Sequence, residues 1–157
     1  MQFNFLTPRV ERVSADGRWV TVHPGGAGGR LRPAVVLLAR DLTTFSLFQA
    51  ENLPRGRRGQ AARLHARTGA PYLISSSALV KSGPDFGVWW WDAERVNALL
   101  QARYGAAGAP MVRPETLAQP SADGWRIVRL DEGYEAQLWR GRRLIASAWR
   151  RDRFDVA

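Results

Sequence analysis

The sequence predicts an α/β fold, a mixed sheet with covering helices followed by a β-rich segment. Three observations lead to this prediction. An apolar run of strand length, 86–91, passes directly into a helical pattern over 93–104. A second helical pattern covers about 57–68, and after residue 123 three short strands alternate with turns. At 157 residues with 45% hydrophobic side chains, the chain is long enough for one ordinary domain with its own core.

The junction around residue 92 carries the clearest local signals. Asp92 can accept the free N–H groups of the first helical turn as an N-cap, and Trp91 can pack on Val96 as a hydrophobic staple. Gly105 offers a stop for the helix. The segment therefore predicts a strand covered by its own helix over 93–104.

Side chains alternate along a strand, so the four residues before Asp92 should divide between two faces. We expect Trp89 and Trp91 to lie under the helix 93–104, with Val88 and Trp90 facing the other side of the sheet.

The N-terminal third predicts short strands. Arg18–Val22 follows the turn dipeptide Asp16-Gly17, and Pro24–Gly29 is a glycine-rich, flexible loop. Ala34–Ala39 and Thr43–Phe48 flank a three-residue connection. We expect these two segments to pair as an antiparallel hairpin with a tight turn.

The helix from about Arg57 to Thr68 follows Leu53-Pro54. Its spacing predicts a shallow inner face formed by Ala61, Leu64 and Thr68. Arginines occupy its remaining surface, and His65 on the same helix has no second ligand nearby, so no chemistry is assigned to it.

The C-terminal half predicts mainly strands. Tyr72–Ile74 and Ala78–Val80 are short strand pieces, and the proline-rich segment Gly108–Pro120 is an extended edge or connector. Alternating segments then predict three strands joined by turns, Trp125–Leu130, Tyr134–Trp139 and Leu144–Trp149.

The composition is strongly basic, with a formal charge of +9 from 23 basic residues, of which only Lys81 is a lysine. A basic surface attracts nucleic acid, anionic lipid headgroups or an acidic protein face. The absence of cysteine excludes disulfides and thiolate chemistry. No run approaches the roughly 18 apolar residues of a membrane span.

Three aspartates that each follow an apolar strand are the candidate metal ligands, Asp41, Asp92 and Asp131. Converging carboxylates could hold two divalent metals for phosphodiester hydrolysis. Asp41 and Asp131 lie in turn sequences, however, and Asp92 is explained as a helix cap. The glycines at 25–29 fit no phosphate-loop spacing, and Ser75–Ser77 lacks a local base. We therefore assign no catalytic residue, no metal and no cofactor.

The chain resembles a known family over most of its length. The residues that carry the resemblance are the capped helix Asp92-Ala93-Glu94-Arg95-Val96-Asn97-Ala98-Leu99-Leu100 and the connector from Gly108 through Pro114-Glu115-Thr116-Leu117 to Pro120. They are similar to the actin-like cytoplasmic region of the type II secretion inner-membrane protein GspL and its PilM and PilN-like relatives in type IV pilus assembly. The resemblance implies a ribonuclease-H-like fold of the actin-like ATPase superfamily.

The resemblance also directs attention to two turns. In nucleotide-binding actin-like proteins, backbone N–H groups of such turns hold phosphate. Here Asp131-Glu132-Gly133 is followed by the bulky Tyr134 and the anionic Glu135, and Asp16-Gly17 lacks a second glycine and a lysine. Nucleotide binding is therefore not expected.

The resemblance divides the chain into a first subdomain, 1–122, and a meander, 123–157, that opens a second, incomplete subdomain. It implies that further cytoplasmic sequence, a membrane helix and a periplasmic domain belong to the whole protein. The expected function is a non-enzymatic docking domain at the cytoplasmic side of the bacterial inner membrane. A basic nucleic-acid-binding domain or metal-dependent nuclease of ribonuclease-H-like fold is the alternative.

The expected partners are proteins of a secretion or pilus assembly platform, among them its cytoplasmic ATPase. A second copy of the chain and an anionic membrane surface are further candidates, whereas nucleic acid is not expected. The candidate partner-binding residues lie on the predicted helix, Arg57, Arg58, Arg63 and Arg67. Arginines at its start oppose the helix dipole, and like charges one turn apart repel each other, so an acidic surface would relieve both.

Overall fold

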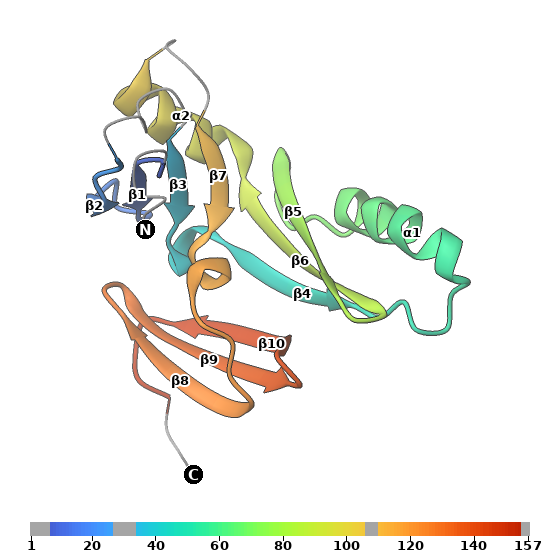
Figure 1. The fold of residues 1–157 in the computed structure, drawn as a ribbon. Coiled ribbons are helices and arrows are strands. Elements are labelled where there is room, and N and C mark those ends of the chain that lie inside the picture. The colour runs from blue at the N-terminus through green and yellow to red at the C-terminus, as the bar shows by residue number, and fades with distance from the viewer. Residues whose placement is uncertain (1–6, 27–33, 106–109, 155–157) are drawn as a thin grey trace. The chain divides into compact units, whose positions relative to one another are not determined.

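The computed structural model describes residues 7–26, 34–105 and 110–154 (Figure 1). The predicted loop Pro24–Gly29 lies partly outside these residues. By internal contacts the chain forms two units, Met1–Leu42 with Glu94–Gln119, and Thr43–Ala93 with Pro120–Ala157. The predicted subdomain division at 122/123 stays a prediction.

The first unit contains a four-stranded mixed sheet in the order β2-β1-β3-β7. Its strands are β1 (Val10–Val13), β2 (Trp19–His23), β3 (Val35–Leu38) and β7 (Met111–Pro114). β1 pairs with β2 antiparallel, whereas β1 with β3 and β3 with β7 run parallel. The connector predicted as an extended edge thus supplies the edge strand β7. Val36, Leu37 and Leu38 are all buried, as expected for a central strand between parallel neighbours.

The predicted hairpin between Ala34–Ala39 and Thr43–Phe48 is wrong. β3 has β1 on one edge and β7 on the other, so no edge is left for the segment that follows. A 3₁₀ turn, η3 (Arg40–Leu42), leads the chain out of this sheet, and β4 (Thr44–Phe48) pairs antiparallel with β6 (Asp85–Asp92) in the second unit.

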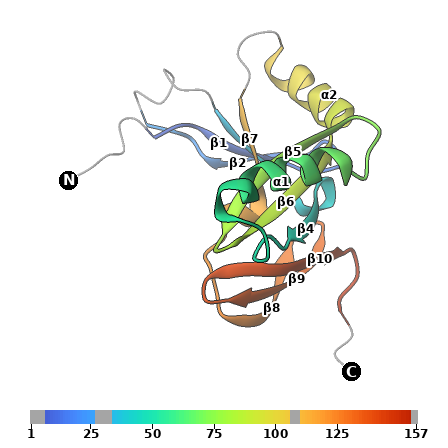
Figure 2. The ribbon, with the colours of Figure 1, turned by 90° about the vertical axis from the view of Figure 1, so that its right-hand side faces the viewer.

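The second unit contains a three-stranded antiparallel sheet in the order β4-β6-β5, with β5 at Ser75–Ser82. The helix α1 (Arg55–Thr68) lies across β5 and β6 (Figure 2). The strand expected at 86–91 and the helix expected at 93–104 are present as β6 and α2 (Ala93–Tyr104). Gly105 ends α2 with a φ of 60° and an N–H that donates to the Gln101 carbonyl.

The core under α1 differs from the predicted inner face. Its buried residues are Ala62 and Ala66, whereas Leu64 is 59% exposed and Thr68 is also exposed. Ala66 packs with Val88 and Trp90 of β6, and the Trp90 indole N–H donates to the Ala66 carbonyl over 2.7 Å. The helix thus approaches the sheet with its smallest side chains because the large ring of Trp90 fills the space between them.

The alternation along β6 is confirmed for Val88, Trp89 and Trp90, because Val88 and Trp90 share one core cluster and Trp89 belongs to another. Trp89 packs with Trp139 and Leu144 of the C-terminal strands, and its ring centre lies 4.7 Å from that of Phe45. Its expected place under the helix 93–104 stays a prediction. Trp91 is buried, and its contact with Val96 stays a prediction.

The C-terminal meander is present as predicted, in the order β10-β9-β8. Its strands are β8 (Gly124–Leu130), β9 (Gly133–Arg140) and β10 (Arg143–Arg150). Gly141 and Arg142 both have positive φ, at 53° and 64°, which matches the twist that a two-residue hairpin turn requires.

A buried polar network follows β9. Glu135 and Gln137 are fully buried and joined by a 2.7 Å hydrogen bond from the Gln137 amide. Arg126 and the Trp139 indole donate to the Gln137 oxygen, and the Ser147 hydroxyl donates to Glu135. Every one of these bonds lies within the meander.

The Trp90 bond supports a stability prediction. Trp90→Phe removes the N–H donor to the Ala66 carbonyl and part of the ring volume, so the free energy of unfolding should fall by about 2 kcal/mol. Urea denaturation followed by circular dichroism measures this. The matched control is Trp125→Phe on β8, where the side chain is 71% exposed and the change should stay within about 0.5 kcal/mol. Equal losses in both variants would contradict the assignment.

Candidate functional site

The exposed surface of α1 carries most of the predicted partner-binding residues. Arg57, Arg63 and Arg67 are all exposed, and none forms an ion pair with a carboxylate in the part of the chain that the structure describes. The first turn of α1 contains no acidic residue, and Pro54 provides no side-chain cap. The positive end of the helix dipole therefore faces uncompensated positive charge.

Arg58 is placed differently from the other three. Its Nε donates to the Leu53 carbonyl over 2.9 Å and its Nη2 donates to the Glu51 carbonyl over 2.7 Å. These bonds hold the chain that enters α1 and leave the positive charge of Arg58 unneutralised. This role could not be predicted from the sequence, because carbonyl acceptors depend on the path of the backbone and not on residue type.

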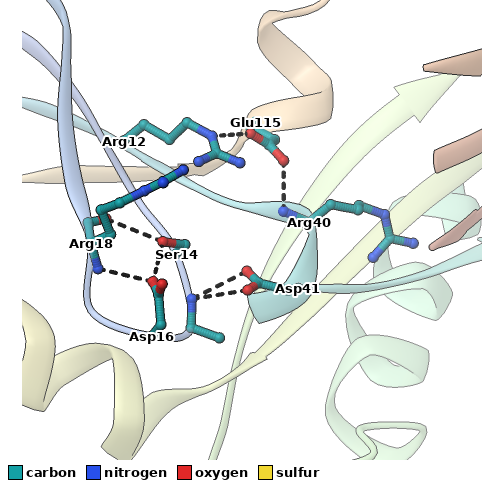
Figure 3. Close-up of polar contacts among 8 residues, drawn as sticks. Arg12, Ser14, Asp16, Arg18, Arg40, Asp41 and Glu115 are labelled. Carbon is teal, nitrogen blue, oxygen red and sulfur yellow. Dashed lines mark hydrogen bonds and ion pairs between the residues drawn. The ribbon is translucent and has the colours of Figure 1, made fainter. Parts of the chain in front are cut away.

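A second candidate site is the turn between β1 and β2, in the first unit (Figure 3). The Gly17 N–H donates to the Ser14 carbonyl, and the Arg18 N–H donates to the Asp16 carboxylate over 3.0 Å. The Ala15 N–H donates to both oxygens of Asp41, at 3.2 and 3.1 Å. Side-chain carboxylates of the protein itself therefore occupy the place that an anion would take at this turn.

Hydrogen bonds also lower the pKa of the Asp16 carboxyl in this turn. The Ser14 hydroxyl donates to Asp16 over 2.6 Å, and together with the Arg18 N–H it lowers the pKa of Asp16 below its ordinary value. Asp16 thus stays ionised at neutral pH and repels a phosphate.

Glu115 joins this region to the connector after β7. It is 7% exposed and begins the 3₁₀ turn η4 (Glu115–Ala118). One of its oxygens accepts the Arg12 Nε–H, and the other accepts the Arg40 backbone N–H over 2.7 Å (Figure 3). The Pro114-Glu115 step of the connector therefore carries a carboxylate that fixes both β1 and η3.

The aspartates weighed as metal ligands form no such site. Asp41 lies in η3 and accepts the Ala15 N–H, whereas Asp92 and Asp131 belong to the second unit. Among residues 7–26, 34–105 and 110–154, no three His, Cys, Asp or Glu side chains are grouped so that they could hold a metal ion. The metal-dependent nuclease therefore has no supporting geometry in this part of the chain.

Buried Glu11 is a third polar site, which the sequence did not indicate. Its carboxylate accepts the Tyr104 hydroxyl over 2.5 Å and the Arg103 guanidinium over 2.6 Å, and Arg9 lies 2.7 Å away. Burial alone would raise the pKa of Glu11, but the bonds from Tyr104 and Arg103 and the nearby positive charges hold it below its usual value. Burial and the bond to Glu11 raise the pKa of Tyr104. These contacts fix the last turn of α2 to β1.

No protein-family model and no curated protein matches the sequence. The chain is similar to the cytoplasmic domain of EpsL, an inner membrane component of the type II secretion system of Vibrio cholerae, with a TM-score of 0.56 and 14% identity. The match covers 89% of this chain and 70% of that chain. The chain has the fold of cytoplasmic EpsL.

A second solved structure, from Bacteroides thetaiotaomicron, is described as having an actin-like ATPase fold and unknown function. Its TM-score is 0.45 at 9% identity, over 92% of this chain and 69% of that chain. The EpsL match confirms the resemblance to the cytoplasmic domain of a type II secretion platform protein at the level of the fold. The predicted α/β class with a mixed sheet and covering helices is confirmed as well.

The described helices are short. α1 has 14 residues and α2 has 12, whereas a membrane span needs about 20 apolar residues. Within the described ranges, no helix is long and apolar enough to cross a membrane.

The occupied turn supports a prediction about nucleotides. Because Asp16 and Asp41 already accept the Arg18 and Ala15 N–H groups, ATP with magnesium should leave the melting temperature unchanged. Differential scanning fluorimetry over a series of ATP concentrations measures this, with magnesium chloride alone as the control. A rise of several degrees that grows with ATP and is absent from the control would overturn it.

The Glu11 site supports a prediction about pH. A carboxyl whose folded-state pKa is lowered adds stability above its unfolded pKa of about 4.3, and this stability is lost as the pH falls through the folded value. Glu11→Gln should lower the free energy of unfolding by about 2 kcal/mol at pH 7. The gap between parent and variant should narrow below about pH 4.

Urea denaturation at several pH values measures this gap. Glu51→Gln, at an exposed position outside the helices, is the matched control and should follow the parent at every pH. A gap for Glu11→Gln that does not change with pH would contradict the ionised, hydrogen-bonded carboxylate.

Proposed function

We propose that the chain is a non-catalytic docking domain of a bacterial type II secretion or type IV pilus assembly platform, at the cytoplasmic side of the inner membrane. The observation that carries this proposal is the shared fold with cytoplasmic EpsL over 89% of the chain. The carboxylates that fill the β1–β2 turn agree with a role that uses no bound nucleotide.

The docking surface we propose is the basic face of α1, which comprises Arg57, Arg58, Arg63 and Arg67. Exposed arginines without carboxylate partners keep their charge available for an acidic surface. The partner is another platform subunit or the assembly ATPase. The anionic inner leaflet and a second copy of the chain are the competing occupants. An anionic leaflet would contribute about 1 kcal/mol for each well-placed basic residue.

The arginines of the first unit are used in a different way. Arg9 and Arg103 are paired with Glu11, and Arg12 is paired with Glu115. Positive charge is therefore partly neutralised in that unit, whereas on α1 it stays open to a partner.

The test replaces the exposed arginines of α1 and spares Arg58, which holds the chain that enters the helix. Arg57→Gln, Arg63→Gln and Arg67→Gln combined should leave the melting temperature unchanged or slightly raised, because repulsive charges are removed. The same variant should bind the purified assembly ATPase of the same organism about tenfold more weakly at low salt. The difference in ATPase affinity between parent and variant should become smaller as salt is added, because salt screens the attraction between the arginines of the parent and the acidic partner. Surface plasmon resonance measures both affinities.

The control is a triple variant with the same loss of charge on the meander, Arg129→Gln, Arg140→Gln and Arg151→Gln. These positions are also exposed. It should bind the ATPase within about twofold of the parent. If the α1 variant binds like the parent at low salt, α1 is not the docking face. If it loses binding only to vesicles with anionic lipid, the occupant is the membrane.

A further inference from the structure

The second unit contains a pocket of about 610 Å³ beside the start of α1. Its walls include Arg55 and Arg58 from α1, and Lys81, Gly83 and Pro84 from the end of β5 and the turn that follows. Phe86, on β6, supplies an aromatic wall. This volume suits a few side chains of a ligand and is too small for a folded element.

Three cations line this pocket, and a fourth, Arg143, lies beside Gly83 in its wall. Arg55, Arg58 and Lys81 line it, and the guanidinium of Arg143 lies so close to Gly83 that a Cβ there would collide with it. Gly83 has a φ of 65°, a backbone conformation that favours glycine.

These cations are not neutralised within the described residues, where none of the four forms an ion pair with a carboxylate. The lining itself contains no acidic side chain. The nearby Asp85 carboxylate accepts the Ala50 N–H over 2.8 Å. Like charges that converge without a counter-charge repel each other, and an anionic ligand would remove that cost.

One of the cations is already held in position. The two bonds from Arg58 to the carbonyls of Glu51 and Leu53 fix its guanidinium while its charge stays free. A charged group that is ordered before binding loses little entropy when the ligand arrives. The pocket therefore combines a preorganised cation with an apolar wall.

We propose that this pocket binds an acidic segment of a partner protein, with its carboxylates on the cations and an apolar side chain against Phe86 and Pro84. The proposal rests on the proposed function, since it names the chemistry of the partner that the domain docks. The apolar wall favours a peptide over inorganic phosphate, because phosphate would use the cations and leave Phe86 without a contact.

The test uses a fluorescein-labelled peptide of about eight residues in which Glu alternates with Leu, followed by fluorescence anisotropy. The pocket variant is Arg55→Gln with Lys81→Gln, which spares Arg58. The matched variant is Arg63→Gln with Arg67→Gln, which removes the same charge from the far half of α1. All four positions are exposed, so circular dichroism and the melting temperature should match the parent.

The pocket variant should bind the peptide at least about tenfold more weakly than the parent, and the matched variant within about twofold. A peptide with Ser in place of Leu, at the same charge, should bind the parent about tenfold more weakly because it makes no contact with Phe86. Equal losses in both variants, or no loss in the pocket variant, would overturn the pocket as the binding site.

Two further measurements distinguish the peptide from inorganic phosphate and from anionic lipid as the ligand. Inorganic phosphate at millimolar concentration should not displace the peptide, and vesicles with anionic lipid should bind the pocket variant and the parent equally. Displacement by phosphate, or vesicle binding that depends on Arg55 and Lys81, would overturn the peptide as ligand. If the pocket variant still binds the assembly ATPase like the parent, the pocket inference fails while the proposed function stands. If both this variant and the α1 triple variant bind the ATPase as tightly as the parent, the result counts against the proposed function itself.

Discussion

The path of the chain depends on two carboxylates that hold the 3₁₀ turn after β3. Glu115 accepts the Arg40 N–H and Asp41 accepts the Ala15 N–H, so the turn is tied to the connector after β7 and to the β1–β2 turn. Because β3 already has a partner on each edge, the tied turn sends the following segment to a different sheet. The same turn therefore marks the point where the chain leaves the mixed sheet of the first unit and enters the antiparallel sheet of the second unit as β4.

Local patterns were sufficient to predict the strand and helix around Asp92, the helix near Pro54 and the three strands after residue 123. Each of these depends on spacing, turn residues and caps within a few positions. Partners far apart in sequence were not predictable in this way. Arg12 and Glu115 are separated by 103 residues, and Trp89 packs on Trp139 of β9.

The candidate site also contains residues that local patterns predicted and residues that depend on long-range folding. Composition and helical spacing predicted an arginine-rich exposed face on α1, and Arg57, Arg63 and Arg67 are exposed there. The structural role of Arg58 and the convergence of Lys81 on the start of α1 could not be predicted, because both depend on how the backbone folds back on itself. The face of α1 that packs on the sheet was predicted wrongly because helical spacing placed the apolar Leu64 on it. Tight packing over Trp90 requires small side chains there, and Ala62 and Ala66 supply them.

The polar network of the meander has a consequence for how its strands find their register. Side chains alternate between faces, so a slip of one residue along β9 would turn Glu135 and Gln137 to the opposite face and separate them from Ser147 and Arg126. A displaced pairing would leave a carboxylate and an amide without their partners, at a cost that apolar side chains at these positions would not impose. The network therefore specifies the strand register, because the native alignment of the three short strands is much lower in free energy than an alignment shifted by one residue.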